Sequence, residues 1–159
     1  MTQQFVGIAE MKLSRNSGDL LLATNLGSCV GVAMYDQQVH VGAMIHCLLP
    51  LSKSDPEKAK KNPFMYVDTG IVRMLEELAS AGADLKRLTI VAAGGANIND
   101  ENNVFEIGKK NITILRKILW KNNLLLKSEH LGESVSRTLS LDITSGATLL
   151  KCRGQIIEL

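Results

Sequence analysis

The chain has 159 residues, of which 45% are hydrophobic and 21% charged, and its formal net charge is +2. This length and composition suit one globular domain, spanning residues 1–159, that buries a core without disulfides. The scattered Lys and Arg residues argue against a nucleic-acid-binding face, and no apolar run approaches the roughly 20 residues of a membrane span. The N-terminus lacks the basic region of a signal peptide, and three cysteines do not suit a secreted disulfide framework. We therefore expect a reduced, cytoplasmic protein.

The first third of the chain predicts four strands, at residues 5–11, 19–25, 29–35 and 39–49. The last two are apolar almost throughout, as in strands that are buried on both faces. A loop of small residues, Leu26-Gly27-Ser28, interrupts the second strand just before the third begins.

The remainder of the chain predicts two long helices among further strands. Residues 50–64 form a polar loop with three prolines, which we expect to be mobile. Helices are expected at 66–81 and 108–122, and strands at 88–93, 124–127, 138–143 and 148–153, with a glycine turn after the strand 88–93 and a polar loop at 97–103. The tally of about eight strands and two helices predicts an α+β fold with mixed or antiparallel sheets packed against helices.

Cys29 and His46 form a candidate catalytic pair. If Gln37-Gln38 is a two-residue hairpin loop, Cys29 lies directly opposite His46 on the neighbouring strand. A three-residue loop would turn His46 to the other face, whereas a four-residue loop is equally compatible with the pair. The alternative is that both side chains are core residues with no chemical role.

The chemistry of such a pair is nucleophilic attack on a carbonyl carbon. A neighbouring imidazolium lowers the pKa of a cysteine, and the resulting thiolate attacks while the ring protonates the departing nitrogen. A loop of small residues also leaves backbone N–H groups free to hold an oxyanion. No C-x-x-C pair is present, and Cys47 is expected to point away from His46, so we expect no metal site and no cofactor.

Several segments resemble the CheD family of bacterial chemoreceptor glutamine deamidases. The resemblance spans roughly residues 5–152 and is carried by the following motifs: LGSCV at 26–30, G-x-M-x-H at 42–46, Leu49-Pro50, Tyr66 with Asp68, Gly94-Gly95-Ala96, IGKKN at 107–111, the 132–137 turn and Thr144-Ser145-Gly146.

The resemblance implies a three-layer α/β/α-type sandwich shared with deamidating toxins. It implies hydrolysis of a receptor glutamine to glutamate with release of ammonia, and methylesterase activity on receptor glutamyl esters. Cys29 would be the nucleophile and His46 the general base and acid. The partners would be the cytoplasmic domain of a chemoreceptor and, in species that have it, the phosphatase CheC. Residues expected to bind substrate or the oxyanion are Gly27, Ser28, Gly94, Gly95 and Asn111.

The chain departs from the family pattern at the third catalytic position. The family's orienting threonine aligns with Ala23, and Thr24 is the next residue. Either a bulge brings Thr24 to His46, or Asn25, Ser28 or a backbone carbonyl orients the ring. Lys110 replaces a preferred arginine, and the 132–137 turn lacks most of the family's glycines.

Two other functions use the same residues. A regulatory binding module for CheC would tolerate a degraded triad. A cysteine protease or a transglutaminase-like enzyme would need the same dyad.

Overall fold

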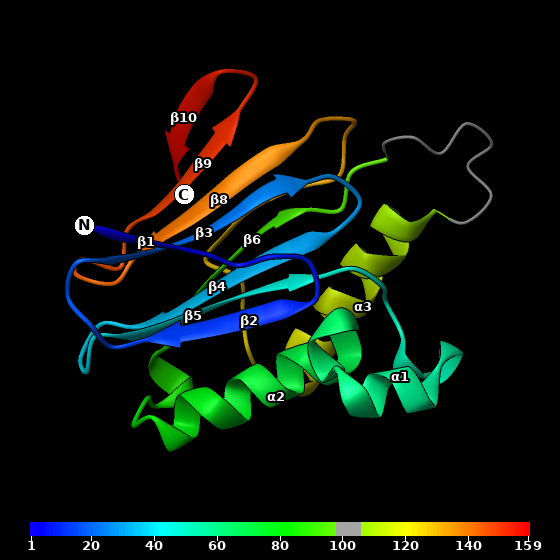
Figure 1. Ribbon diagram of the computed structural model, residues 1–159, viewed down its shortest axis with the longest axis horizontal. Coiled ribbons are helices and arrows are strands. Elements are labelled where there is room, and N and C mark those ends of the chain that lie inside the picture. The colour runs from blue at the N-terminus through cyan, green and yellow to red at the C-terminus, as the bar shows by residue number, and fades with distance from the viewer. Residues whose placement is uncertain (98–105) are drawn as a thin grey trace.

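The computed structural model describes residues 1–97 and 106–159, which form two five-stranded sheets with the helices gathered on one side (Figure 1). The strands are β1 (Thr2–Phe5), β2 (Glu10–Ser14), β3 (Asp19–Leu26), β4 (Val30–Asp36), β5 (Val41–Cys47), β6 (Thr89–Gly94), β7 (Ser128–Leu131), β8 (Arg137–Asp142), β9 (Thr148–Cys152) and β10 (Gln155–Glu158). The α-helices are α1 (Pro56–Lys61), α2 (Val67–Ser80) and α3 (Ile107–Lys121), and short 3₁₀ turns are η1 (Ser52–Ser54), η2 (Pro63–Met65) and η3 (Leu85–Arg87).

Both sheets are mixed, which confirms the predicted α+β class. The first sheet has the order β1-β3-β8-β9-β10, with β1 parallel to β3 and the other pairs antiparallel. The second sheet has the order β2-β5-β4-β6-β7, and only its β6–β7 pair is parallel. Strands β4 and β5 therefore lie inside the second sheet, with neighbours on both sides.

The layers follow the order sheet, sheet, helices, which differs from the α/β/α order that the resemblance implied. One face of β4 and β5 packs on α2 and α3, and the other packs on the first sheet. This is why β4 and β5 are buried along their whole length. The first sheet alternates buried and exposed residues in β9, so its outer face needs no covering helices.

The predicted strand at residues 5–11 is wrong. The chain leaves the first sheet after Phe5, turns at Ala9 (φ 64°), and enters the second sheet at Glu10. The alternation of Phe5, Gly7 and Ala9 imitates a strand, but the segment crosses between the two sheets. This crossing brings Val6, which is buried, beside β5.

The prediction of an irregular loop at residues 50–64 is also wrong, because most of the segment forms short helices. Pro56 and Pro63 occupy the first turns of α1 and η2, where the missing N–H of proline costs no hydrogen bond. The side chains of Asp55 and Asn62 cap these two turns by accepting backbone N–H groups.

Both long helices are confirmed to within one residue at each end, whereas the strand predicted at 124–127 is wrong. Pairing with β6 begins only at Ser128, so the strand is β7, and the prediction missed both β7 and β10. The predicted polar loop at 97–103 lies, after Asn97, outside the described residues. None of the helices in the two described ranges is long and apolar enough to span a membrane.

Candidate active site

The β4–β5 hairpin places Cys29 and His46 on one face, but not directly opposite each other. The last strand pair is Asp36–Val41, so the loop has four residues and Gly31 is the partner of His46. Cys29 precedes Gly31 by two residues and therefore shares its face, which puts Cys29 diagonally across from His46. The register predicted from a two-residue loop is wrong by two residues, and the alternative four-residue loop is the one present. The shared face is retained because the shift is even.

His46 points into the space between the two sheets and is 2% exposed. Its Nδ1 atom lies 3.1 Å from the carbonyl oxygen of Val6. Since a carbonyl only accepts, Nδ1 carries the proton and Nε2 keeps its lone pair. Nε2 is buried and has no hydrogen-bond partner among the described residues. The ring is thus held in the tautomer that a general base needs.

Burial sets the charge state of His46. Burial lowers the pKa of the ring below its usual value, and the hydrogen bond to Val6 and the charge of Glu10 offset only part of this shift. The imidazole is therefore neutral at neutral pH, with a lone pair ready to take a proton.

Cys29 ends the small loop that precedes β4, and it is 6% exposed. Burial raises the pKa of its thiol, and a hydrogen bond from its own backbone N–H opposes the rise only in part. The sequence led us to expect a pKa lowered by an imidazolium, and that expectation is wrong for the unliganded protein. The resting pair consists of a neutral thiol and a neutral imidazole, so the thiol must lose its proton when it attacks.

Cys47 neighbours His46 in sequence but lies on the other face of β5. It belongs to the core between the second sheet and the helices, whereas Cys29 belongs to the core between the two sheets. Burial raises the pKa of Cys47 strongly. The prediction that Cys47 points away from His46 is confirmed, and Cys47 takes no part in the pair.

The glycine turn after β6 holds the Cys29 loop in place through two backbone hydrogen bonds. Gly95 N–H donates to the Cys29 carbonyl at 2.8 Å, and Ala96 N–H donates to the Gly27 carbonyl at 2.8 Å. Gly94 has φ 111°, and a Cβ there would overlap the Cys29 carbonyl oxygen. The N–H of Gly95 is therefore already occupied, and its contribution to the site is to position the loop rather than to hold an oxyanion.

Asn111 ties the same loop to the end of β5. It is fully buried in the first turns of α3, and its Nδ2 donates to the carbonyls of Ser28 at 2.9 Å and Leu48 at 3.2 Å. Its Oδ1 is buried without a partner among the described residues. Asn111 therefore joins the segment carrying Cys29 to the segment carrying His46, and its free oxygen can still accept one N–H.

Arg137 is a buried residue of the site that sequence reasoning did not single out. It is 1% exposed, and its guanidinium donates to the carbonyls of Gly94 and Gly132 and to Nδ1 of His130. Arg137 thereby positions the Gly94-Gly95 turn, and this turn positions the Cys29 loop. Its position in the 132–137 segment was the only indication in the sequence.

Thr24 is not brought to His46. The buried and half-buried residues of β3 alternate, with Ala23 buried in the core between the sheets and Thr24 on the opposite face. The β-bulge of β3 lies between Ala23 and Leu26, and it leaves this alternation intact through Thr24. Among the alternatives, the Val6 carbonyl is the group that lies at the His46 ring.

Comparisons with known proteins show the family of the chain. A family model described as CheD chemotactic sensory transduction matches residues 48–152. The chain belongs to the CheD family. A probable chemoreceptor glutamine deamidase CheD 1 of Syntrophus aciditrophicus is 43% identical over 154 residues, covering 97% of this chain and 96% of the relative. A probable chemoreceptor glutamine deamidase CheD of Solibacter usitatus is 42% identical over 159 residues, covering 100% and 94%.

A more distant CheD relative, from Thermococcus kodakarensis, is 33% identical and covers 96% of both chains. The family-model match begins at residue 48, after Cys29 and His46, whereas the alignment to the Solibacter relative covers the whole of this CheD chain. The predicted resemblance to CheD is therefore confirmed.

Proposed function

We propose that this CheD protein hydrolyses the side-chain amide of glutamine residues on a chemoreceptor, giving glutamate and ammonia. The observation that carries the proposal is the His46 ring. Its Nδ1 is fixed by Val6, and its Nε2 is buried, unpaired within residues 1–97 and 106–159, and on the face that Cys29 shares. The names of the relatives support the substrate class. All 159 residues act as one cytoplasmic deamidase domain, whose fold is related to that of deamidating toxins.

The reaction begins when the Cys29 thiol gives its proton to Nε2 of His46. The sulfur attacks the amide carbon, and the carbonyl oxygen becomes an oxyanion that the N–H of Cys29 and its loop stabilise. His46 then passes the proton to the departing nitrogen, which leaves as ammonia. Water, deprotonated by His46, hydrolyses the thioester and releases glutamate.

Access to the sulfur requires a movement of the loop at residues 27–29. Cys29 is 6% exposed, whereas Gly27 and Ser28 are half-buried and reach the surface. A carboxamide enters when this loop moves outward. Its amide N–H can then donate to Oδ1 of Asn111, which has no hydrogen-bond partner in the described part of the chain. Burial also keeps the unliganded thiol neutral, which limits its side reactions.

The test is mass spectrometry of a receptor cytoplasmic fragment incubated with the protein. Each converted glutamine gains about one mass unit, as an amide becomes an acid. We expect Cys29→Ala to abolish conversion, whereas Cys152→Ala, at a cysteine of β9 in the other sheet from His46, retains it. Conversion by Cys29→Ala at the wild-type rate would disprove the mechanism.

A second candidate function is binding to the CheC phosphatase with little catalysis. The buried Cys29 and the outward face of Thr24 favour it, because both suit a chain whose catalytic site has decayed. Binding of CheC that survives Cys29→Ala, in a protein that converts no glutamine, would support this candidate. An amine-incorporation assay distinguishes the deamidase and CheC-binding functions from a transglutaminase-like enzyme, because only the last would transfer the glutamine acyl group to an added amine.

A further inference from the structure

The peptide group between Val6 and Gly7 joins the His46 ring to a carboxylate. Its carbonyl oxygen lies 3.1 Å from Nδ1 of His46, and its N–H donates to Oε1 of Glu10 at 2.6 Å. A trans peptide points its C=O and N–H groups in opposite directions, so the ring and the carboxylate lie on opposite sides of one planar unit. We call this unit the bridging peptide.

Strand pairing independently brings Glu10 beside His46. The two residues are direct partners in the antiparallel β2–β5 pair, so their side chains leave the second sheet on the same face, with Cβ atoms about 5 Å apart. Ser14, four residues further along β2 and on the same face as Glu10, donates its hydroxyl to Asp19 of the first sheet. This face of β2 is therefore the one that meets the first sheet. Since β2 is an edge strand, Glu10 is also exposed (Figure 1).

The turn that carries the bridging peptide is fixed by further hydrogen bonds. The N–H of Glu10 donates back to the Gly7 carbonyl at 3.1 Å, which closes the turn. Ala9 donates its N–H to the His46 carbonyl at 2.8 Å, and its own carbonyl accepts from Nδ2 of Asn62 at 3.0 Å. The carboxylate of Glu10 completes this set of contacts by binding the N–H of the bridging peptide.

The negative charge of Glu10 also acts on the ring. It raises the pKa of His46, against the larger effect of burial. A carboxylate bound to the N–H end of a peptide also polarises the peptide and makes its carbonyl oxygen a stronger acceptor. On the faces that meet between the two sheets, the described residues include these other charged or titratable groups: Lys12, Asp19, Cys29, Tyr35, Arg137 and Cys152. Glu10 is the one among them that is paired with His46 and whose charge shifts its pKa.

We propose that Glu10 is a positioning residue of the reaction, which orients His46 through the bridging peptide and stabilises the imidazolium that forms when Cys29 gives up its proton. No proton moves along the peptide, because the thiol proton goes to Nε2 and Nδ1 keeps its own. Glu10 thus does through a peptide what a carboxylate bound directly to the ring does in a Ser-His-Asp triad. The inference rests on the proposed function.

The pH profile of Glu10→Gln tests the effect of the charge. Glutamine keeps an oxygen that can accept the N–H of the bridging peptide, but it carries no charge. We expect the acid limb of kcat/KM for the receptor fragment to move to lower pH, because the ring is protonated less readily without the nearby carboxylate. The rate on the plateau should also fall. A lower plateau with an unmoved acid limb would overturn the proposal, since damage to the structure alone does not change the titration of the base.

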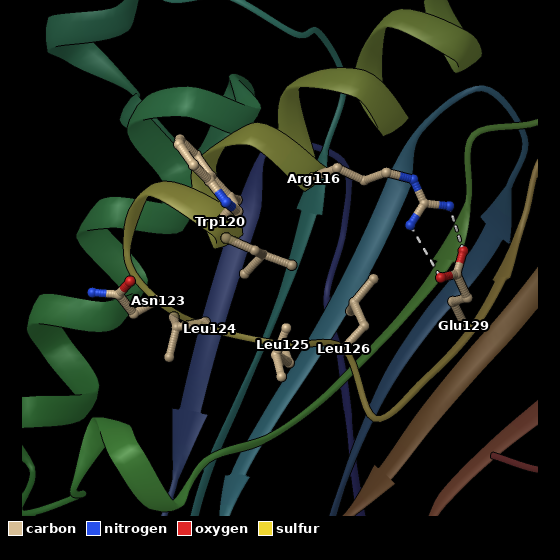
Figure 2. Close-up of a pocket in the computed structure, with 8 residues that line it drawn as sticks. Arg116, Trp120, Asn123, Leu124, Leu125, Leu126 and Glu129 are labelled. Carbon is tan, nitrogen blue, oxygen red and sulfur yellow. Dashed lines mark hydrogen bonds and ion pairs between the residues drawn. The ribbon is translucent and has the colours of Figure 1, made fainter.

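Glu129→Gln is the matched control for the loss of a carboxylate. Glu129 is an exposed residue of β7, the other edge strand of the same sheet, and Arg116 binds its carboxylate beside a surface pocket at α3 (Figure 2). It pairs with Ala92, which packs on the helices, so Glu129 lies on the opposite face from His46. The acid limb should stay in place in this variant. An equal displacement in both variants would show that net charge is responsible and would refute the role of Glu10.

Nitrogen-15 NMR of the histidine rings tests the positioning without any substrate. His46 should show the Nδ1–H tautomer, and its signals are those that persist in both His40→Ala and His130→Ala. In Glu10→Ala we expect less of this tautomer, because the bridging peptide is no longer fixed, and a kcat about tenfold lower. Glu10→Gln should restore the tautomer. If Glu10→Ala keeps the wild-type tautomer, the proposal is wrong.

The deamidase function and the role of Glu10 fail in distinguishable ways. If wild-type protein converts no glutamine but the titration and tautomer of His46 respond to Glu10, the deamidase function is wrong and the link from Glu10 to His46 stands. If conversion proceeds and neither the acid limb nor the tautomer responds to Glu10, the deamidase function stands and the role of Glu10 is wrong.

Discussion

The Nδ1 atom of His46 lies 3.1 Å from the carbonyl oxygen of Val6, a residue in the segment that crosses from the first sheet to the second. The same segment also holds the backbone of β5, because Ala9 N–H donates to the His46 carbonyl at 2.8 Å. A backbone group therefore fixes the tautomer of the proposed base, in the role that a side chain plays in many triads.

The pH dependence of deamidation should report this base. Below the pKa of His46 the ring is protonated at Nε2 and cannot accept the thiol proton, so the rate falls as the pH is lowered. Burial lowers this pKa, so we expect the acid limb of kcat/KM to have its midpoint below about 6.5, the usual histidine value.

The control for the pH profile is His40→Ala, because His40 lies in the β4–β5 loop at the far end of the hairpin. It should leave the acid limb in place, whereas His46→Ala should reduce the rate to background. A midpoint well above 6.5 in the wild type would contradict the buried, neutral base.

Alkylation by iodoacetamide should rank Cys29 and Cys47 by access and ionisation. Burial raises the pKa of Cys29, so its labelling at neutral pH should be slower than that of a free thiol and should increase as the pH rises. Cys47, which is fully buried with a strongly raised pKa, should label more slowly than Cys29. Mass spectrometry of labelled peptides measures both rates, and faster labelling of Cys47 would contradict the structure.

Substitution of Gly94 should damage the site through the Cys29 loop. Gly94→Ala places a Cβ against the Cys29 carbonyl at φ 111°, and we expect a loss of about 1–3 kcal/mol in unfolding free energy and a lower kcat. Gly18→Ala is the matched control, because Gly18 has φ 93° but open space around its Cβ position. Urea unfolding and deamidation rates measure the two effects, and equal outcomes for the two variants would show that strain alone is responsible.

Replacement of Asn111 by aspartate should separate the Cys29 loop from β5. The carboxylate of Asn111→Asp would face the Ser28 and Leu48 carbonyls in place of an N–H donor, and we expect a loss of about 1–3 kcal/mol and a lower kcat. Asn122→Asp, at the exposed end of α3, should cost only about 0.5 kcal/mol. A fully active Asn111→Asp protein would show that this tie does not position the loop.

Local patterns predicted the elements whose periodicity was strong. Helix α2 follows from the spacing of Ile71, Met74 and Leu78, and the apolar run of β4 indicated a strand buried on both faces. Proline-rich residues 50–64 were misinterpreted, because Pro56 and Pro63 each follow an N-capping side chain and therefore begin a helical turn, a signal that the loop prediction overlooked.

The shared face of Cys29 and His46 was predictable, but their diagonal offset was not. The shared face and the offset both depend on the length of the loop after β4. Any loop with an even number of residues keeps Cys29 and His46 on one face, but the exact number decides which residues are paired. The four loop residues at 37–40 include His40, which has φ 53°, a backbone conformation that the sequence does not predict.

The sequence by itself determined the α+β class, the nucleophile–base pair as a candidate and membership of a family, because these depend on composition, periodicity and short motifs. Only the tertiary structure decided which group faces His46, how Asn111 and the Gly94 turn hold the Cys29 loop, and that both long helices cover one sheet. Those features are contacts between segments far apart in the chain, several of them made by backbone atoms that every residue shares. Their partners follow from the path of the folded chain and not from side-chain identity.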